Sequence, residues 1–85
     1  MPVQPDEILA AIEDVARRHV GFTGGLRPEQ RLVEDLELDS LKALTLALEV
    51  ENRFRICLDP ETEATIETVG DLVRAVERLL DEDDG

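Results

Sequence analysis

Apolar residues recur at helical spacing in three segments of the chain. The first segment begins at Pro5, has acidic residues in its first turn and basic residues in its last, and is followed by Gly21. Glu13 and Asp14 each precede an arginine by four positions, a spacing that supports a helix through ion pairs. Its apolar positions are Ile8, Leu9, Ile12, Val15 and Ala16. This segment therefore predicts an amphipathic helix.

The second segment, residues 40–54, contains more apolar residues than one narrow helical stripe can hold. One series suits the core and comprises Ala43, Leu46, Ala47, Val50 and Phe54. A second series, Leu41, Leu44 and Leu48, is rotated around the helix. We expect a neighbouring helix to bury Leu44, whereas Leu41 and Leu48 fit either burial or a partner-binding surface. The solvent side should contain Lys42, Thr45, Glu49 and Asn52.

The third segment begins at Thr68, which forms a possible capping box with Asp71. Its apolar positions are Val69, Leu72, Val73, Val76, Leu79 and Leu80. A shorter helix is predicted before it, because Asp59 is a good N-cap and Pro60 suits the first helical position. This short helix should end between residues 64 and 66. The pattern thus predicts only helical elements.

Two connections complete the chain. Residues 21–39 contain three glycines and a proline, which favour a long loop. Apolar side chains should attach this loop to the core, namely Phe22, Leu26, Leu32, Val33, Leu36 and Leu38. Residues 55–58 alternate like a strand but have no partner strand, so we interpret them as an extended connection with Ile56 turned inward.

Composition limits the possible partners. The 85 residues fit one domain, residues 1–85, and their net charge of −12 repels nucleic acids and anionic membranes. Partners should present basic patches. No secretory signal or membrane-spanning run is evident, and Cys57 is the single cysteine, so we expect a soluble, cytoplasmic monomer. The acidic tail, residues 81–85, should fray at the end of its helix.

The junction between loop and second helix contains the most informative chemistry. Asp39 is a good N-cap, which makes Ser40 the first helical residue and leaves its hydroxyl exposed. A phosphate on that hydroxyl would lie at the positive end of the helix dipole. The surrounding residues lack the glycines of a nucleophile elbow, and Lys42 points to another helix face, so no catalytic residue is predicted. A structural serine, a phosphorylation site and a site modified by a dedicated enzyme all remain possible.

Other candidate sites have weaker support. His19 has no second histidine nearby, and we interpret it as a surface residue at a helix end. Cys57 has no close histidine to activate it. The alternating acids of residues 35–39 lack the glycine and glutamate that a calcium-binding EF-hand loop requires, so no metal site is predicted.

Three stretches together resemble acyl carrier proteins: Glu34-Asp35-Leu36-Glu37-Leu38-Asp39-Ser40-Leu41, Ala47-Leu48-Glu49-Val50-Glu51-Asn52-Arg53-Phe54 and Ile66-Glu67-Thr68-Val69-Gly70-Asp71-Leu72. The resemblance covers almost the whole chain and implies an all-α fold, a small four-helix bundle with a short third helix. It also implies that a separate phosphopantetheinyl transferase attaches 4′-phosphopantetheine from coenzyme A to Ser40. The thiol of that group would hold acyl intermediates as thioesters. Asp39 would orient the serine and the transferase's metal-bound substrate.

Two departures from the family pattern bear on partners and pathway. Many fatty-acid carriers have glycine in place of Glu37 and a strongly acidic face along the second helix. Here Lys42 and Thr45 interrupt that face, which leaves Glu49 and Glu51 as its main acids. Either fatty-acid or polyketide and other specialised biosynthesis is therefore plausible. The predicted partner-binding residues are Leu41, Lys42, Thr45, Leu48 and Glu49. The alternatives are an aminoacyl carrier, against which Asp39 argues, and an unmodified carrier-like interaction module.

Overall fold

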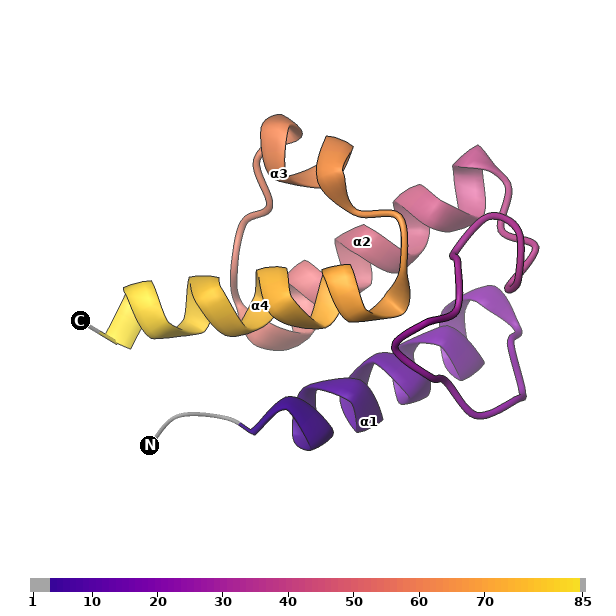
Figure 1. Ribbon diagram of the computed structural model, residues 1–85, viewed down its shortest axis with the longest axis horizontal. Helices are drawn as coiled ribbons and strands as arrows, with labels where there is room; N and C mark the ends of the chain where they lie inside the picture. The colour runs from indigo at the N-terminus through magenta and orange to yellow at the C-terminus, as the bar shows by residue number, and fades with distance from the viewer. Residues whose placement is uncertain (1–3, 85) are drawn as a thin grey trace.

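The computed structural model describes residues 4–84, which form four α-helices and one π-helical segment (Figure 1). The elements are α1 (Pro5–Val15), η1 (Ala16–Val20), α2 (Ser40–Phe54), α3 (Pro60–Thr65) and α4 (Val69–Asp84). The predicted fold class, a small helical bundle with a short third helix and a long loop between the first two helices, is confirmed. None of the helices between residues 4 and 84 is long and apolar enough to cross a membrane.

The first helix is longer than α1 alone, because η1 continues it to Gly21. Gly21 has a φ of 75°, the left-handed conformation that commonly ends a helix. Asp14 forms the predicted ion pair with Arg18 at 3.1 Å. The predicted pair of Glu13 with Arg17 is wrong: Glu13 instead accepts a hydrogen bond from the backbone N–H of Leu26 at 2.8 Å. The loop returns over α1 there, and a partly buried N–H needs an acceptor.

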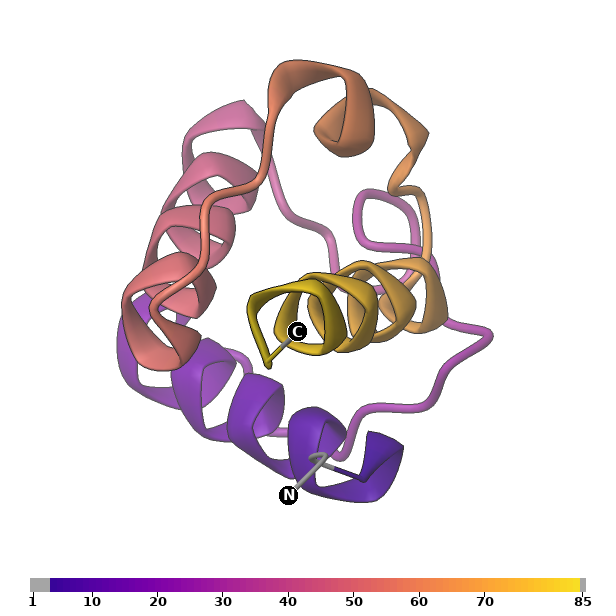
Figure 2. The same cartoon turned by 90° about the vertical axis from the view of Figure 1, so that its left-hand side faces the viewer.

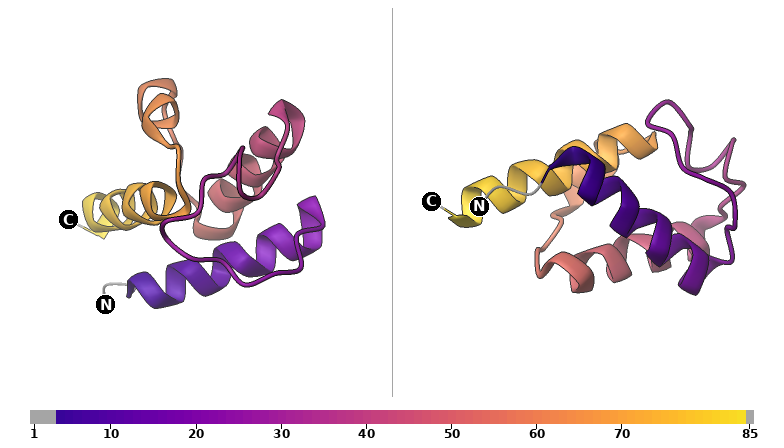
Figure 3. Two further views of the ribbon diagram at one scale, coloured as in Figure 1. Left: turned by 45° about the vertical axis from the view of Figure 1, so that its right-hand side comes forward. Right: turned by 90° about the horizontal axis from the view of Figure 1, so that it is seen from below.

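The core lies where α1, α2 and α4 face one another. α1 contacts both α2 and α4, and α4 lies between α1 and α3 (Figures 2 and 3). The largest fully buried side chains are Ile8, Ile12, Leu46, Val50, Val69 and Val76. Each comes from a position that the helical spacing assigned to the core, so periodicity alone identified the centre of the bundle.

The long loop is fixed to the start of α4. The backbone N–H of Leu32 donates to the Glu67 carbonyl at 3.0 Å, and that of Val69 donates to the Gln30 carbonyl at 2.9 Å. Four of the six predicted anchors are buried, namely Leu26, Leu32, Leu36 and Leu38, and Phe22 is partly buried. The prediction is wrong for Val33, which is 66% exposed because its neighbour Leu32 occupies the inward position.

Residues 55–84 agree with most of the predictions made from the sequence. Asp59 caps α3 by accepting from the Thr62 N–H at 2.7 Å. Ile56 is partly buried as predicted, but Leu58 is buried more deeply at 5% exposure, and Cys57 is exposed. The helix α4 extends through Asp84, and the fraying expected for the acidic tail stays a prediction. Gly85, the end of the predicted tail, lies outside the described residues.

Candidate functional site

The start of α2 combines a firm cap with an open hydroxyl. Asp39 has an extended backbone, and its Oδ1 accepts a hydrogen bond from the Lys42 N–H at 2.8 Å. Ser40 is the first residue of α2 and is exposed. Figure 1 places this helix start at the end of the bundle opposite the two chain termini. The predicted N-cap and the predicted position of Ser40 are both confirmed.

Two buried leucines hold the segment that leads into Ser40. Leu36 and Leu38 are 6% and 3% exposed, and the N–H of Leu38 donates to the Leu32 carbonyl at 3.2 Å. Glu37 between them has a φ of 56°, the left-handed conformation that a non-glycine residue adopts at a cost of about 1–2 kcal/mol. This turn lets both leucines point inward. Ser40 is therefore exposed on a backbone that is itself anchored.

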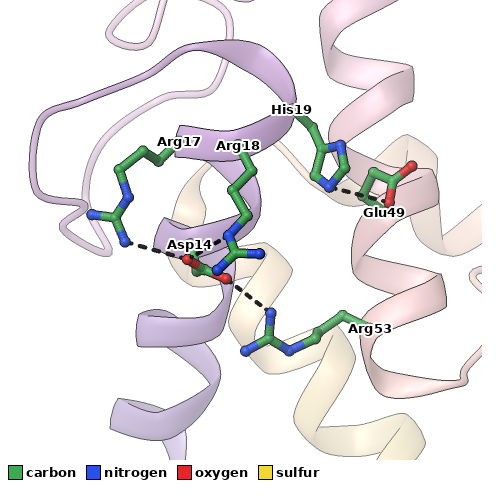
Figure 4. A network of polar contacts seen from close by, with 6 residues as sticks. All are labelled: Asp14, Arg17, Arg18, His19, Glu49 and Arg53. Carbon is green, nitrogen blue, oxygen red and sulfur yellow. Dashed lines mark hydrogen bonds and ion pairs between the residues drawn. The ribbon is translucent and has the colours of Figure 1, made fainter.

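Among residues 4–84, no hydrogen bond or ion pair links Ser40 to a base that could activate it. His19 instead faces Glu49, which lies nine positions after Ser40 on α2, with 3.4 Å between His19 Nε2 and Glu49 Oε1 (Figure 4). Within residues 4–84, no group of three potential ligands is arranged to hold a metal ion. What the site offers is an accessible hydroxyl at a helix N-terminus, where a phosphate ester is electrostatically favoured.

An apolar surface extends from this site along α2. Leu41, Leu44 and Leu48 are 71%, 51% and 49% exposed. The prediction that a neighbour buries Leu44 is wrong, because Leu44 is 51% exposed and lies outside the face of α2 on which Leu46 and Val50 are buried. Its shared spacing with Leu41 and Leu48 could have indicated this exposure.

The polar residues predicted to bind partners differ in availability. Lys42 is exposed. Thr45 donates from Oγ1 to the Leu41 carbonyl at 2.9 Å, and Glu49 faces His19, so both engage groups of their own chain. Beside the His19–Glu49 pair, Asp14 bonds Arg17, Arg18 and Arg53 at distances of 3.1–3.3 Å (Figure 4). The hydrogen bond from Arg53 is the main cause that lowers the pKa of Asp14.

A cavity of about 210 Å³ opens next to the apolar surface, between α2 and α3, and shares Leu44 with it. Its main lining residues are Leu32, Leu44, Leu46, Glu63, Ile66 and Leu72. Two small residues of α2, Ala43 and Ala47, also line it and leave room between the larger side chains. This cavity could not be predicted from the sequence, because it depends on how α3 is placed over α2.

Comparisons with known proteins agree with this geometry. The family model described as the phosphopantetheine attachment site matches residues 6–76. The chain is 32% identical over 83 residues to the meromycolate extension acyl carrier protein of Mycobacterium tuberculosis, a match covering 96% of this chain and 72% of the relative. Its identity to an acyl carrier protein of Myxococcus xanthus is 29% over 69 residues, covering 80% of this chain and 87% of the relative.

A solved structure also resembles this chain. An acyl carrier protein from Mycobacterium tuberculosis superposes with a TM-score of 0.76 at 35% sequence identity, over 81% of this chain and 93% of that one. Proteins of this family are non-catalytic carriers whose prosthetic group is 4′-phosphopantetheine. The match over residues 6–76 and the similarity in sequence and structure show that the chain belongs to the acyl carrier protein family.

Proposed function

We propose that Ser40 is the residue to which 4′-phosphopantetheine is attached, and that residues 1–85 act as one discrete acyl carrier domain. The observation that supports this most directly is the exposed Ser40 hydroxyl at the capped start of α2, inside the matched family region. When bound, the group supplies a thiol that holds an acyl chain as a thioester. A separate transferase attaches it, so Ser40 needs no base of its own.

The residues around Ser40 fit a phosphate ester. The first N–H groups of a helix are unpaired and favour negative charge, and Asp39 caps the Lys42 N–H. We infer that Asp39 keeps the first turn in place and presents its second carboxylate oxygen toward the transferase's substrate. Leu36 and Leu38 fix the approach of the chain, so the attachment point stays stationary while the arm moves.

The cavity beside α2 supports a role in holding an acyl chain. Two of its lining residues, Ala43 and Leu44, lie about one helical turn after Ser40. Its volume of about 210 Å³ exceeds the roughly 150 Å³ of an engineered apolar cavity that binds benzene. We infer that a short acyl chain on the arm enters this cavity and is shielded from water there.

The proposed partners are the phosphopantetheinyl transferase and the enzymes that load and process the acyl chain. The net charge of −12 would steer partners with basic patches toward the molecule. We propose that contact involves Leu41, Lys42, Thr45, Leu48 and Glu49, and that exposed Leu44 joins them. Relatives named for meromycolate extension favour a pathway that builds acyl chains. A polyketide pathway, a cytoplasmic location and a monomeric state remain predictions.

The test of attachment uses coenzyme A, a phosphopantetheinyl transferase of broad specificity and intact-protein mass spectrometry. The wild-type chain should gain one phosphopantetheine, and Ser40→Ala should gain none. A circular dichroism melt of Ser40→Ala should match that of wild type, since the Ser40 hydroxyl is exposed. A wild-type chain that stays unmodified would contradict the proposal, as would modification of Ser40→Ala.

One observation favours a second candidate, the unmodified interaction module. The exposed surface of Leu41, Leu44 and Leu48 could bind a partner without any prosthetic group. That candidate predicts partner binding by Ser40→Ala equal to binding by the modified protein. An aminoacyl carrier would instead be recognised by loading of the modified protein with an amino acid rather than an acyl chain.

A further inference from the structure

The cavity between α2 and α3 has one charged lining residue among the described residues that form it, Glu63. Every other lining residue is apolar. Glu63 is partly buried, and no ion pair or side-chain hydrogen bond formed within residues 4–84 engages its carboxylate. Glu63 therefore brings to the edge of an apolar cavity a charged side chain whose carboxylate has no partner within residues 4–84.

The position of Glu63 is set by a short, well-capped helix. Its N–H donates to the Asp59 carbonyl at 2.9 Å, and its carbonyl accepts from the Ile66 N–H at 3.1 Å. Ile66 also lines the cavity, and Leu58, buried at 5% exposure, precedes the cap. The backbone of Glu63 is thus fixed at the cavity even though α3 has only six residues.

A plain hydrocarbon chain would be a poor occupant of this cavity. It would displace water from the Glu63 carboxylate without supplying a hydrogen-bond donor, and an ionised group that loses water without a partner is strongly disfavoured. A hydroxyl on the chain would replace that water with a charge-assisted hydrogen bond. An ammonium group has three N–H donors and would find a single carboxylate among apolar neighbours.

We propose that this cavity selects short acyl chains that carry a hydroxyl group, with Glu63 as the residue that determines the preference. The inference rests on the proposed attachment of the arm at Ser40, which would deliver the chain to Ala43 and Leu44. Glu63 accepts a hydrogen bond and takes part in no covalent step. The cargo class is then a hydroxylated short-chain thioester rather than a saturated one.

Free thioesters test the preference independently of attachment. The unmodified protein, labelled with ¹⁵N, is titrated with the N-acetylcysteamine thioesters of hexanoic, 3-hydroxyhexanoic, 5-hydroxyhexanoic and 3-aminohexanoic acids. Amide shifts of Ala43, Ala47 and Leu72 report binding in the cavity. At least one hydroxyhexanoyl thioester should bind about tenfold more tightly than the hexanoyl thioester, as expected for a hydrogen bond to a charged group.

Two variants isolate the carboxylate. Glu63→Leu should bind the hexanoyl thioester more tightly than wild type and lose the preference for a hydroxyl. Glu61→Gln is the matched control, because Glu61 is an exposed acid of the same helix that does not line the cavity, and it should keep the wild-type preference. A melting curve for each variant checks that the fold is retained.

Several outcomes would overturn the inference: equal binding of all thioesters by wild type, tightest binding of the amino thioester, or an unchanged preference in Glu63→Leu. The same comparison on protein charged at Ser40 from the corresponding acyl-coenzyme A adds a second measurement. Failure of attachment appears there as an unchanged protein mass, whereas failure of the preference appears as equal amide shifts. The two failures are therefore distinguishable.

Discussion

The starts of α2 and α4 are capped by similar residues, but the loop covers the start of α4 and leaves the start of α2 exposed. At α4, Thr68 Oγ1 accepts from the Asp71 N–H at 3.1 Å, and Asp71 Oδ2 accepts from the Thr68 N–H at 3.2 Å. The loop adds the Pro28 carbonyl, which accepts from the Gly70 N–H at 2.9 Å. The chain thus satisfies these donors at the start of α4, so they are not available to bind a ligand.

At α2 the chain supplies one side-chain cap, from Asp39 to the Lys42 N–H, and Ser40 stays exposed. The same loop supports both starts: its middle covers α4, and its end leads into α2 through Leu36 and Leu38. The difference shows how a small bundle can keep an attachment point open. The start of α4 uses its N–H groups to bind the loop. The loop in turn holds the start of α2 in position.

The largest expected effect is on phosphopantetheine transfer, which should depend on the cap of α2 and not on the cap of α4. Asp39→Asn retains a good N-cap but removes the charge, so we expect the rate of phosphopantetheine transfer to fall about 10–100-fold, the usual loss when an orienting group is replaced. The free energy of unfolding should change by less than about 0.5 kcal/mol. Initial rates of transfer, followed by mass spectrometry, and urea unfolding provide the two measurements. Asp71→Asn is the matched control and should leave the rate unchanged.

The second prediction concerns the start of α4, which the loop covers. A Cβ on Gly70 would lie 3.0 Å from the Pro28 carbonyl oxygen and 3.2 Å from Pro28 Cβ. Gly70→Ala should therefore lower the free energy of unfolding by about 1–2 kcal/mol through overpacking against the loop backbone. Gly25→Ala is the control, because its Cβ would meet only Glu13 Oε2 at 3.7 Å, an ordinary contact distance. Equal stabilities of the two variants in urea would refute this account of the close approach.

The third prediction concerns Asp71, whose contribution to the free energy of unfolding should depend on pH and should be no larger than the effect of Gly70→Ala. Hydrogen bonds from the N–H groups of Glu67 and Thr68 are the main cause that lowers the pKa of Asp71. Because the folded pKa is lower than the unfolded one, the ionised carboxylate stabilises the fold above pH 5, and this contribution disappears as the pH falls through the folded pKa. Wild type should therefore exceed Asp71→Asn in stability by about 1 kcal/mol at pH 7, and this excess should shrink as the pH falls below the unfolded pKa and through the folded one. An excess that does not change with pH in urea unfolding would assign the effect to something other than the ionised carboxylate.

Sequence reasoning found both helix starts because cap chemistry is local. Asp39, Thr68 and Asp71 occupy the predicted positions, and each bonds the backbone within three residues. The predictions from sequence were wrong where burial or bonding depends on residues that are distant in the chain. The exposure of Leu44 and the bond from Leu26 to Glu13 are set by which faces the loop and the other helices cover.

The cavity illustrates the same limit. Glu63 is an ordinary acid in the sequence of a short helix, and only the placement of α3 over α2 gives it apolar surroundings. The roles of Ser40, Asp39 and the partner-binding residues remain predictions, since position and exposure alone do not measure modification or binding.

The smallest expected effect concerns Glu37, whose turn leads to the open helix start. Its φ of 56° suits glycine better than glutamate, so Glu37→Gly relieves backbone strain while it raises the entropy of the unfolded chain. The net result should be a gain of about 0.5 kcal/mol in the free energy of unfolding. Glu34→Gly, at an exposed loop residue without a positive φ, gains no such relief and should lose about 0.5–1 kcal/mol. Equal losses for both glycine variants in urea would show that the left-handed turn at Glu37 stores no strain, and Leu36 and Leu38 would then reach the core without it.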